Sequence, residues 1–394
     1  MTSNLWITNH PRNFWQCRPA PSEAAWEAAI ARALPCLGLS IDHADMETIL
    51  AQTLGEGRCG RNHWELGFTK RMYYLVKPIL PRSLTRQLRR DFSPCSEVLV
   101  DWPVEPRFVQ FLWEILRQIR LQSGAEDMEI RSLWPERKHY ALCLTHDIEA
   151  QAGQSFVLDV AALEESLGFR SSFNFIPERY KLNFTLMDEL RRRGFEVGVH
   201  GLKHDGKLFA SKSTFMRRAK RINRYLKQWG AKGFRSELTH RQPEWMQALD
   251  VEYDLSFFDT DPFEPIPGGT MSIWPFFLGH FVELPYTLVQ DYSLTAILQK
   301  HSPQIWLDKA EFIEKYHGMV LVNSHPDYLQ EKSNWNVYEE FLQAMKKREG
   351  YWHALPLDVA RWWKTRAAPV PQTDGAEAVF SKVFLDGESI KIEN

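Results

Sequence analysis

Short apolar runs alternate with amphipathic stretches from about residue 136 to residue 365. Seven of the runs have the length expected of buried strands, namely 141–145, 171–176, 195–199, 232–235, 251–256, 281–285 and 319–324. From Thr214 to Trp229, apolar residues keep one helical face and basic residues take the other. Strands that alternate with helices are typical of β/α units, so this part is predicted to be an α/β domain with a parallel sheet.

The flanking residues follow other patterns. The N-terminal region is predicted to be mostly helical, with helices at Ser22 to Leu34 and Phe108 to Ile119. A linker-like stretch follows Lys364, and Ala378 to Ile392 has two strand-like runs around Asp386-Gly387, a strong hairpin signal. We expect a helical region, an α/β domain and a linker with a β-hairpin tail, at 1–135, 136–365 and 366–394.

The segment from Lys70 to Arg90 is basic. It holds seven basic residues among aromatic and aliphatic ones and no acidic residue, and Pro78 and Pro81 exclude one unbroken helix. One interpretation is peripheral contact with an anionic membrane or an anionic glycan. The other is a solvated helical hairpin, which we favour because charge runs usually face water.

Composition narrows the functional classes. A formal charge of -2 and 44% hydrophobic residues argue against disorder and against a nucleic-acid partner. Fifteen tryptophans suit either sugar contact or core filling, and we favour core filling for most of them. The five cysteines are scattered without CxxC spacing, which favours a reducing compartment. The sequence lacks a signal peptide and a run of ~20 apolar residues, so we expect a cytoplasmic protein.

Two carboxylates follow the apolar run 141–145. If the strand continues, Asp147 and Glu149 project to one face, while His146 and Ile148 point to the other. The carboxyl ends of parallel strands carry the active site in α/β barrels and open α/β sheets. Asp147 and Glu149 are therefore candidate catalytic or metal-binding groups.

Two histidines four residues apart follow the run 195–199. Neutral imidazole is a common zinc ligand, and Gly198, Gly201 and Gly206 supply the tight backbone path that would let His200 and His204 meet one ion. One carboxylate and two histidines would leave open metal positions for water and substrate. The second carboxylate would then be free to act as a base.

Two more predicted strands end in candidate groups. Arg235 ends the run 232–235 and could hold a catalytic carboxylate in its ionised form, or it could be a structural salt-bridge partner. His325 follows the run 319–324 and could be a general acid, or it could cap the strand before Pro326.

The order of these motifs resembles a known family. T-H-D-x-E, H-x3-H, G-F-R and a late apolar strand ending in His follow one another from about 140 to 360, as in the polysaccharide deacetylase (NodB homology, carbohydrate esterase 4) family. The resemblance is to the bacterial branch whose first motif begins T-H-D. It implies a distorted (β/α)7-type, NodB-like barrel that removes acetyl groups from N-acetylated sugars with a divalent metal, usually zinc.

The resemblance also implies residue roles. Asp147 matches the general base, His200 and His204 match the metal ligands, and His325 matches the general acid. The usual first motif, T-F-D-D, places a metal-binding Asp next to the base, where this chain has Ile148.

Glu149 is therefore the expected third ligand, although the residues alone leave Asp147 or Glu149 open as the carboxylate ligand. Arg235 matches the arginine of the third motif, where Ser236-Glu237-Leu238 replaces the usual proline and aromatic residue. Asp254, Asp259 and Asp261 compete as the expected fourth-motif partner of Arg235. The loop Pro262 to Phe277 is either a sugar-stacking rim or a turn followed by core aromatics.

Together these observations predict a metal-dependent hydrolase that removes N-acetyl groups from a sugar or polysaccharide precursor, as in exopolysaccharide biosynthesis. The expected partner is an N-acetylated glycan, with no obligate protein partner. Two alternatives remain: an amidase acting on non-carbohydrate C–N bonds, and a catalytically degenerate glycan-binding or assembly protein.

Overall fold

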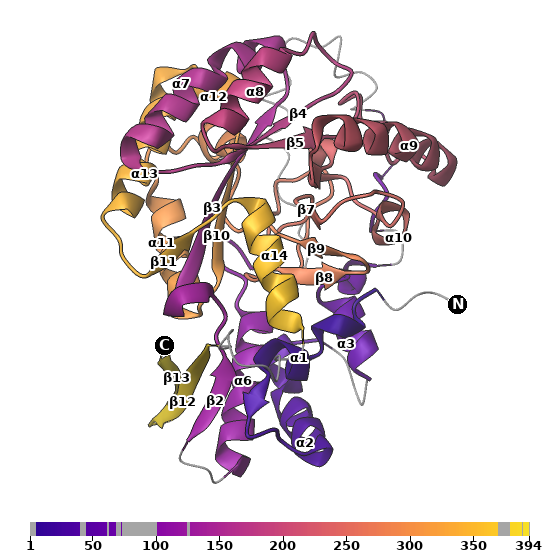
Figure 1. Ribbon diagram of the computed structural model, residues 1–394. Coiled ribbons are helices and arrows are strands. Elements are labelled where there is room, and N and C mark those ends of the chain that lie inside the picture. The colour runs from indigo at the N-terminus through magenta and orange to yellow at the C-terminus, as the bar shows by residue number, and fades with distance from the viewer. Residues whose placement is uncertain are drawn as a thin grey trace.

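The computed structural model describes residues 5–39, 45–60, 63–67, 72, 101–123, 127–368, 379–387 and 389–393 (Figure 1). Apart from Met72, the basic segment from Lys70 to Arg90 lies outside these residues, so both interpretations of it stay predictions.

A nine-stranded sheet forms the core of the α/β domain. Its continuous parallel run has the order β10 (Met319–Ser324), β3 (Tyr140–Ile148), β4 (Ser172–Phe175), β5 (Glu196–His200), β6 (Gly233–Arg235), β7 (Tyr253–Asp254) and β9 (Phe281–Glu283). The two remaining strands are β8 (Phe276–Leu278), antiparallel to β9, and β11 (Tyr351–His353), parallel to the beginning of β3. The seven strands of the parallel run confirm the seven predicted apolar runs.

The sheet curls until its two ends are joined by hydrogen bonds. Beyond β9, the backbone N–H groups of Thr287 and Leu288 each donate to the carbonyl of Leu321 on β10, at 3.2 Å. The Thr287 hydroxyl also donates to the carbonyl of Met319 at 2.8 Å. These contacts close the side of the barrel and confirm the predicted distorted (β/α)7-type fold.

Helices cover the outside of the sheet (Figure 1). They are α7 (Gln151–Leu167), α8 (Phe184–Arg192), α9 (Lys212–Trp229), α10 (Pro243–Met246), α11 (Gln304–Lys315), α12 (Pro326–Leu329), α13 (Lys332–Lys346) and α14 (Pro356–Ala367). Helix α9 confirms the predicted amphipathic helix, because Phe215, Ile222 and Leu226 are buried on one face. Its N-cap is Ser211, whose hydroxyl accepts from the Thr214 N–H. None of the described helices is long and apolar enough to cross a bilayer.

The N-terminal region is mostly helical, as predicted. Its elements are η1 (Ile7–Asn9), α1 (Pro11–Trp15), β1 (Cys17–Arg18), α2 (Glu23–Ala33), η2 (Leu34–Leu37), α3 (Met46–Gln52), η3 (Gly57–Cys59), α6 (Arg107–Ser123), β2 (Met128–Arg131) and η5 (Pro135–Arg137). Helices α2 and α6 confirm the two predicted helices, and the hydroxyl of Ser22 caps α2 by accepting from the Ala25 N–H at 3.2 Å.

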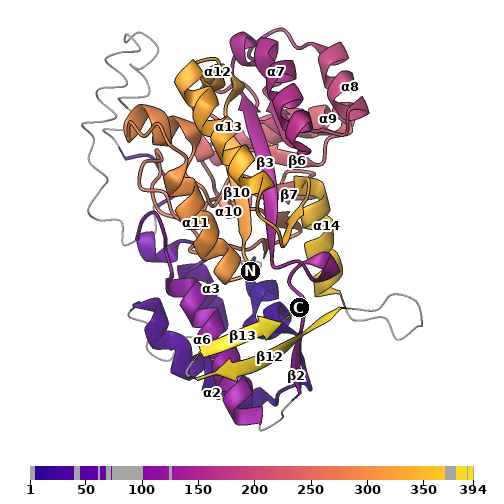
Figure 2. The ribbon, with the colours of Figure 1, turned by 90° about the vertical axis from the view of Figure 1, so that its left-hand side faces the viewer.

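The C-terminal tail forms the predicted hairpin, with β12 (Phe380–Asp386) antiparallel to β13 (Ser389–Glu393). Strand β12 also pairs with β2, so the hairpin completes a four-stranded sheet of order β1-β2-β12-β13 with the N-terminal region (Figure 2). The tail is thus tied to the N-terminal region by backbone hydrogen bonds. The expected division into three parts stays a prediction.

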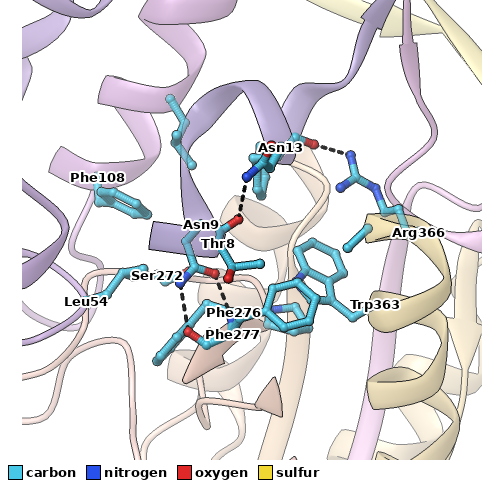
Figure 3. Close-up of a pocket in the computed structure, with 14 residues that line it drawn as sticks. Thr8, Asn9, Asn13, Leu54, Phe108, Ser272, Phe276, Phe277, Trp363 and Arg366 are labelled. Carbon is cyan, nitrogen blue, oxygen red and sulfur yellow. Dashed lines mark hydrogen bonds between the residues drawn. The ribbon is translucent and has the colours of Figure 1, made fainter. Parts of the chain in front are cut away.

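Aromatic residues fill the junction between the N-terminal region and the barrel. The side-chain amide of Asn9 donates to the Phe277 carbonyl at 2.8 Å and accepts from the Phe277 N–H at 2.7 Å (Figure 3). Phe14 packs edge-on against Trp274 with ring centroids 5.2 Å apart. The fully buried tryptophans include Trp15, Trp134, Trp274 and Trp306, which confirms core filling for these four.

The pocket drawn in Figure 3 lies in this junction. Among the described residues, its lining contains no carboxylate, histidine or cysteine, the residue types that bind zinc.

Candidate active site

The predicted site residues gather at the carboxyl ends of four parallel strands. Asp147 lies near the end of β3, His200 ends β5, Arg235 ends β6, and His325 directly follows β10. Because the four strands run in one direction, these ends meet at the same end of the barrel.

Glu149, His200 and His204 form a group whose ligand atoms all lie within 4.8 Å of one another. The Oε1 atom of Glu149 is 2.8 Å from Nε2 of His204. The Nδ1–H of His200 donates to the Arg235 carbonyl at 3.2 Å, which leaves the lone pair of its Nε2 free to bind a metal. Within the described chain, the Nε2 atom of His200 is buried without a hydrogen-bond partner, and the Nε2 atom of His204 contacts the Glu149 carboxylate. An unpartnered imidazole nitrogen beside a second imidazole and a carboxylate fits a divalent cation.

The loop after β5 turns sharply to bring the second histidine back to the first. Gly201 and His204 both have left-handed backbone conformations, with φ of 57° and 51°. Glycine adopts this conformation freely, whereas a histidine there is strained, which is common at functional sites. The two imidazole rings end 5.1 Å apart.

Burial and the neighbouring carboxylates shift the pKa values of the two histidines in opposite directions. Burial lowers the pKa of His200 to about 4, so its ring is neutral and suited to metal binding. Burial also lowers the pKa of His204, but the neighbouring Glu149 outweighs it and raises that pKa overall. The pKa of Glu149 itself lies well below its usual range because His204 outweighs the effect of burial.

Asp147 lies beside this group and accepts hydrogen bonds from donors on three other strands. Its Oδ1 accepts from Arg235 and Asn174, and its Oδ2 accepts from Asn323, each at 3.2 Å. Burial would raise the pKa of Asp147, but Arg235 and the nearby histidines lower it to about 2. Asp147 is therefore ionised, with Oδ2 4.0 Å from Nε2 of His200.

The expectation that Asp254, Asp259 or Asp261 partners Arg235 is wrong. Within the described chain, the ion pair of Arg235 is with Asp147. The three acids bind elsewhere: Asp254 accepts from Ser256, Asp259 pairs with Lys309 at 2.7 Å, and Asp261 accepts from Tyr286. Arg235 instead reaches across the barrel interior, where it also donates to Thr145 and Asn323.

His325 is held by Asp291, which sequence reasoning missed. The Asp291 carboxylate accepts from His325 Nδ1 at 2.7 Å and from its backbone N–H at 2.8 Å. Burial lowers the pKa of His325, but Asp291 outweighs it and raises the pKa to about 10. His325 is therefore protonated near neutral pH, with Nε2 3.9 Å from Oε1 of Glu149.

Asn174 and Asn323 were also missed, although each is a polar residue inside an apolar run, which is a usable signal. Gly198 gives Asn174 its room, because a Cβ at Gly198 would lie 2.1 Å from the Asn174 Oδ1 atom. For Asp291 the only signal is an acid following the apolar pair Leu288-Val289.

His146 lies on the opposite face of β3 from Asp147, as predicted. Its fully buried ring is bonded to the Ser324 hydroxyl at 2.8 Å and to Glu164 at 2.7 Å. Ser324 is its register partner on β10, so this contact joins the two strands directly behind the site. In the loop Pro262 to Phe277, the rings of Trp274 and Phe276 are buried in the core, so sugar stacking on these two is excluded.

The sequence matches no protein-family model and no curated protein. Solved structures do resemble the chain. A protein described as a polysaccharide deacetylase from Mycobacterium smegmatis is 16% identical, with 62% of this chain and 96% of that chain covered and a TM-score of 0.48. Another, from Pseudomonas aeruginosa PAO1, is 14% identical, with coverages of 60% and 94% and a TM-score of 0.49.

The Puue allantoinase is 13% identical, with coverages of 60% and 93% and a TM-score of 0.47. Polysaccharide deacetylases, the family that the motifs resemble, are thus among the solved structures similar to this chain. Because these likenesses are distant, the function is argued from the geometry of the site.

Proposed function

We propose that the protein is a metal-dependent hydrolase that removes N-acetyl groups from a sugar or polysaccharide precursor. One observation carries the proposal: a buried imidazole nitrogen of His200 without a hydrogen-bond partner in the described chain lies with the His204–Glu149 pair, between an ionised Asp147 and a protonated His325.

Glu149, His200 and His204 would hold the metal, and zinc suits two imidazoles and a carboxylate. Asp147 suits this role less, because Arg235, Asn174 and Asn323 already bind its oxygens. When bound, a divalent cation supplies Lewis-acid polarisation of the acetamido carbonyl.

The remaining chemistry belongs to side chains of this protein. Asp147 takes a proton from the attacking water, and its three donors keep it ionised and oriented for this role. His325 donates the Nε2 proton to the departing amine nitrogen, while Asp291 holds the Nδ1–H and so keeps Nε2 aimed at the site. The C–N bond breaks, the water oxygen becomes part of acetate, and the amine nitrogen gains a proton.

The substrate class follows from the family resemblance. It remains our expectation that a cytoplasmic precursor of an exopolysaccharide is the substrate.

Acetate release from N-acetylglucosamine oligosaccharides tests the proposal. The zinc-loaded protein should release acetate, chelator treatment should abolish release, and added metal should restore it. Hydrolysis of small cyclic amides in place of acetylated sugars would establish the amidase alternative. Sugar binding without hydrolysis by the metal-loaded protein would establish the degenerate binding protein.

A further inference from the structure

The stretch from Gly198 to Trp229 is strongly basic in a chain whose charges nearly balance. The whole chain has 48 Lys and Arg residues against 50 Asp and Glu residues. Asp205 is the only acid in this stretch. The basic residues are Lys203, Lys207, Lys212, Arg217, Arg218, Lys220, Arg221, Arg224 and Lys227.

Four of these cations form a stripe along the outer face of α9. Arg217, Lys220, Arg224 and Lys227 are all exposed, and their spacing of three, four and three residues places them on one side of the helix. Across the described residues, none of the four has an ion-pair partner, and α9 itself contains no acid. Figure 1 shows α9 on the outer edge of the barrel, away from the N-terminal region.

The flanking arginines are already paired. Arg218 binds both oxygens of Asp205, at 2.6 and 2.7 Å, and Arg221 pairs with Glu178. The stripe is therefore not the outer half of a salt-bridge network. Because Asp205 directly follows His204, the Arg218 pair also ties α9 to the loop that carries both histidines of the candidate site.

We propose that this face of α9 docks the protein on the surface of an anionic phospholipid bilayer. The stripe is straight and about 15 Å long at the helical rise of 1.5 Å per residue, so all four cations can reach the headgroups of one plane. Each such cation strengthens association about fivefold, so four cations together strengthen it several hundredfold. Because the whole chain has a net charge of -2, its attraction to an anionic bilayer comes from local basic surfaces and not from the overall charge. A local attraction of this kind orients the molecule on the bilayer.

A flexible polyanion fits this face less well than a bilayer does. Single-stranded polyanions bind in grooves where aromatic side chains form stacking platforms. The exposed large hydrophobic residues of the described chain include none from α9. The docking proposal does not depend on the proposed hydrolase activity, because binding is measured directly.

Flotation with lipid vesicles tests the proposal. The full-length protein should float with phosphatidylcholine vesicles that contain phosphatidylglycerol and not with phosphatidylcholine alone, and binding should weaken as salt rises. The variant R217E/K220E/R224E/K227E should lose at least about a hundredfold in affinity.

The matched control reverses four exposed lysines elsewhere, K300E/K332E/K346E/K347E, with the same change in net charge. This control should lose far less affinity, and circular dichroism should show both variants folded. The proposal is overturned if the wild type does not bind anionic vesicles, or if the α9 variant binds as the wild type does. It is equally overturned if the stripe binds dextran sulfate and not vesicles.

Discussion

Two regions of the molecule bring together residues of the kinds that bind metals, and they differ in what their lone pairs already contact. One is the group Glu149, His200 and His204, and the other is Glu56, Cys59 and His63 in the N-terminal region. In each group the ligand atoms lie within 4.8 Å of one another.

In the second group, the carboxylate is fully committed. Glu56 accepts from Arg241 at 2.9 and 2.6 Å and from the Gly269 N–H at 3.2 Å, and it also contacts His63 at 2.6 Å. A divalent cation there would meet the guanidinium charge. Burial also raises the pKa of the Cys59 thiol to about 11, away from the thiolate that binds metals.

The first group is less committed, because in the described chain the Nε2 atom of His200 has no hydrogen-bond partner and the Glu149 carboxylate pairs with histidine and with no arginine or lysine. Residue type and spacing thus do not separate a metal site from a structural clamp. The charge partner of the carboxylate does. Glu56 pairs with Arg241, which clamps the N-terminal region onto the barrel, whereas Glu149 pairs with the imidazole of His204.

The largest expected effect is on folding, at the clamp. Glu56→Gln leaves Arg241 buried without a carboxylate and should lower the free energy of unfolding by about 3–5 kcal/mol. The matched variant Glu149→Gln should lose less stability than Glu56→Gln, because it leaves an imidazole that can become neutral rather than a buried guanidinium, and it should lose much metal affinity. Urea unfolding and metal analysis of both variants measure this. Loss of metal from a folded Glu56→Gln variant would erase the distinction between the two groups.

The next effect is on catalysis. Asp147→Asn removes the base and His325→Ala removes the acid, so each should reduce kcat about a hundredfold or more, or about 2.7 kcal/mol, with metal content unchanged. His63→Ala, from the clamp, is the control and should keep kcat. Near-normal turnover by His325→Ala would make His325 a structural strand terminus.

A smaller effect concerns the pH profile. Asp291 raises the pKa of His325 to about 10, and Asp291→Asn should let it fall toward the ordinary value of 6.5 or below, because burial then acts unopposed. A general acid works only when protonated, so activity falls as pH rises through this pKa. The alkaline limb of kcat should therefore move to lower pH in the variant. An unmoved limb would separate His325 from the proton transfer.

The smallest effect is expected at Asn174. Asn174→Ala removes one of the donors to ionised Asp147, which raises the pKa of Asp147 and should cost about tenfold in kcat. Because a base works only when ionised, the acidic limb should move to higher pH. Unchanged kcat and an unchanged acidic limb would show that Arg235 and Asn323 suffice.

Much of this arrangement was predictable from local sequence. The strands were found because a strand covered on both faces must be apolar, and Asp147, His200, Arg235 and His325 were found because polar groups at strand ends interrupt that pattern. That these groups gather at one end of the barrel follows from the parallel direction of the strands alone.

What could not be predicted depends on closure of the sheet. Arg235 meets Asp147 because β6 and β3 face each other across the barrel, a relation absent from their separation of 88 residues. Asp291 reaches His325 because the chain after β9 returns to β10. The pairing of β12 with β2 likewise joins the C-terminal tail to a segment far from it in the sequence.

Metal content is the most direct test of the central claim that Glu149, His200 and His204 form the metal site. The purified wild type should bind about one divalent ion per chain. The variant H200A/H204A should bind almost none while remaining folded, and the clamp variant C59S/H63A should bind as the wild type does. A folded H200A/H204A variant that keeps its metal, or a wild type that binds no zinc on titration, would contradict the account.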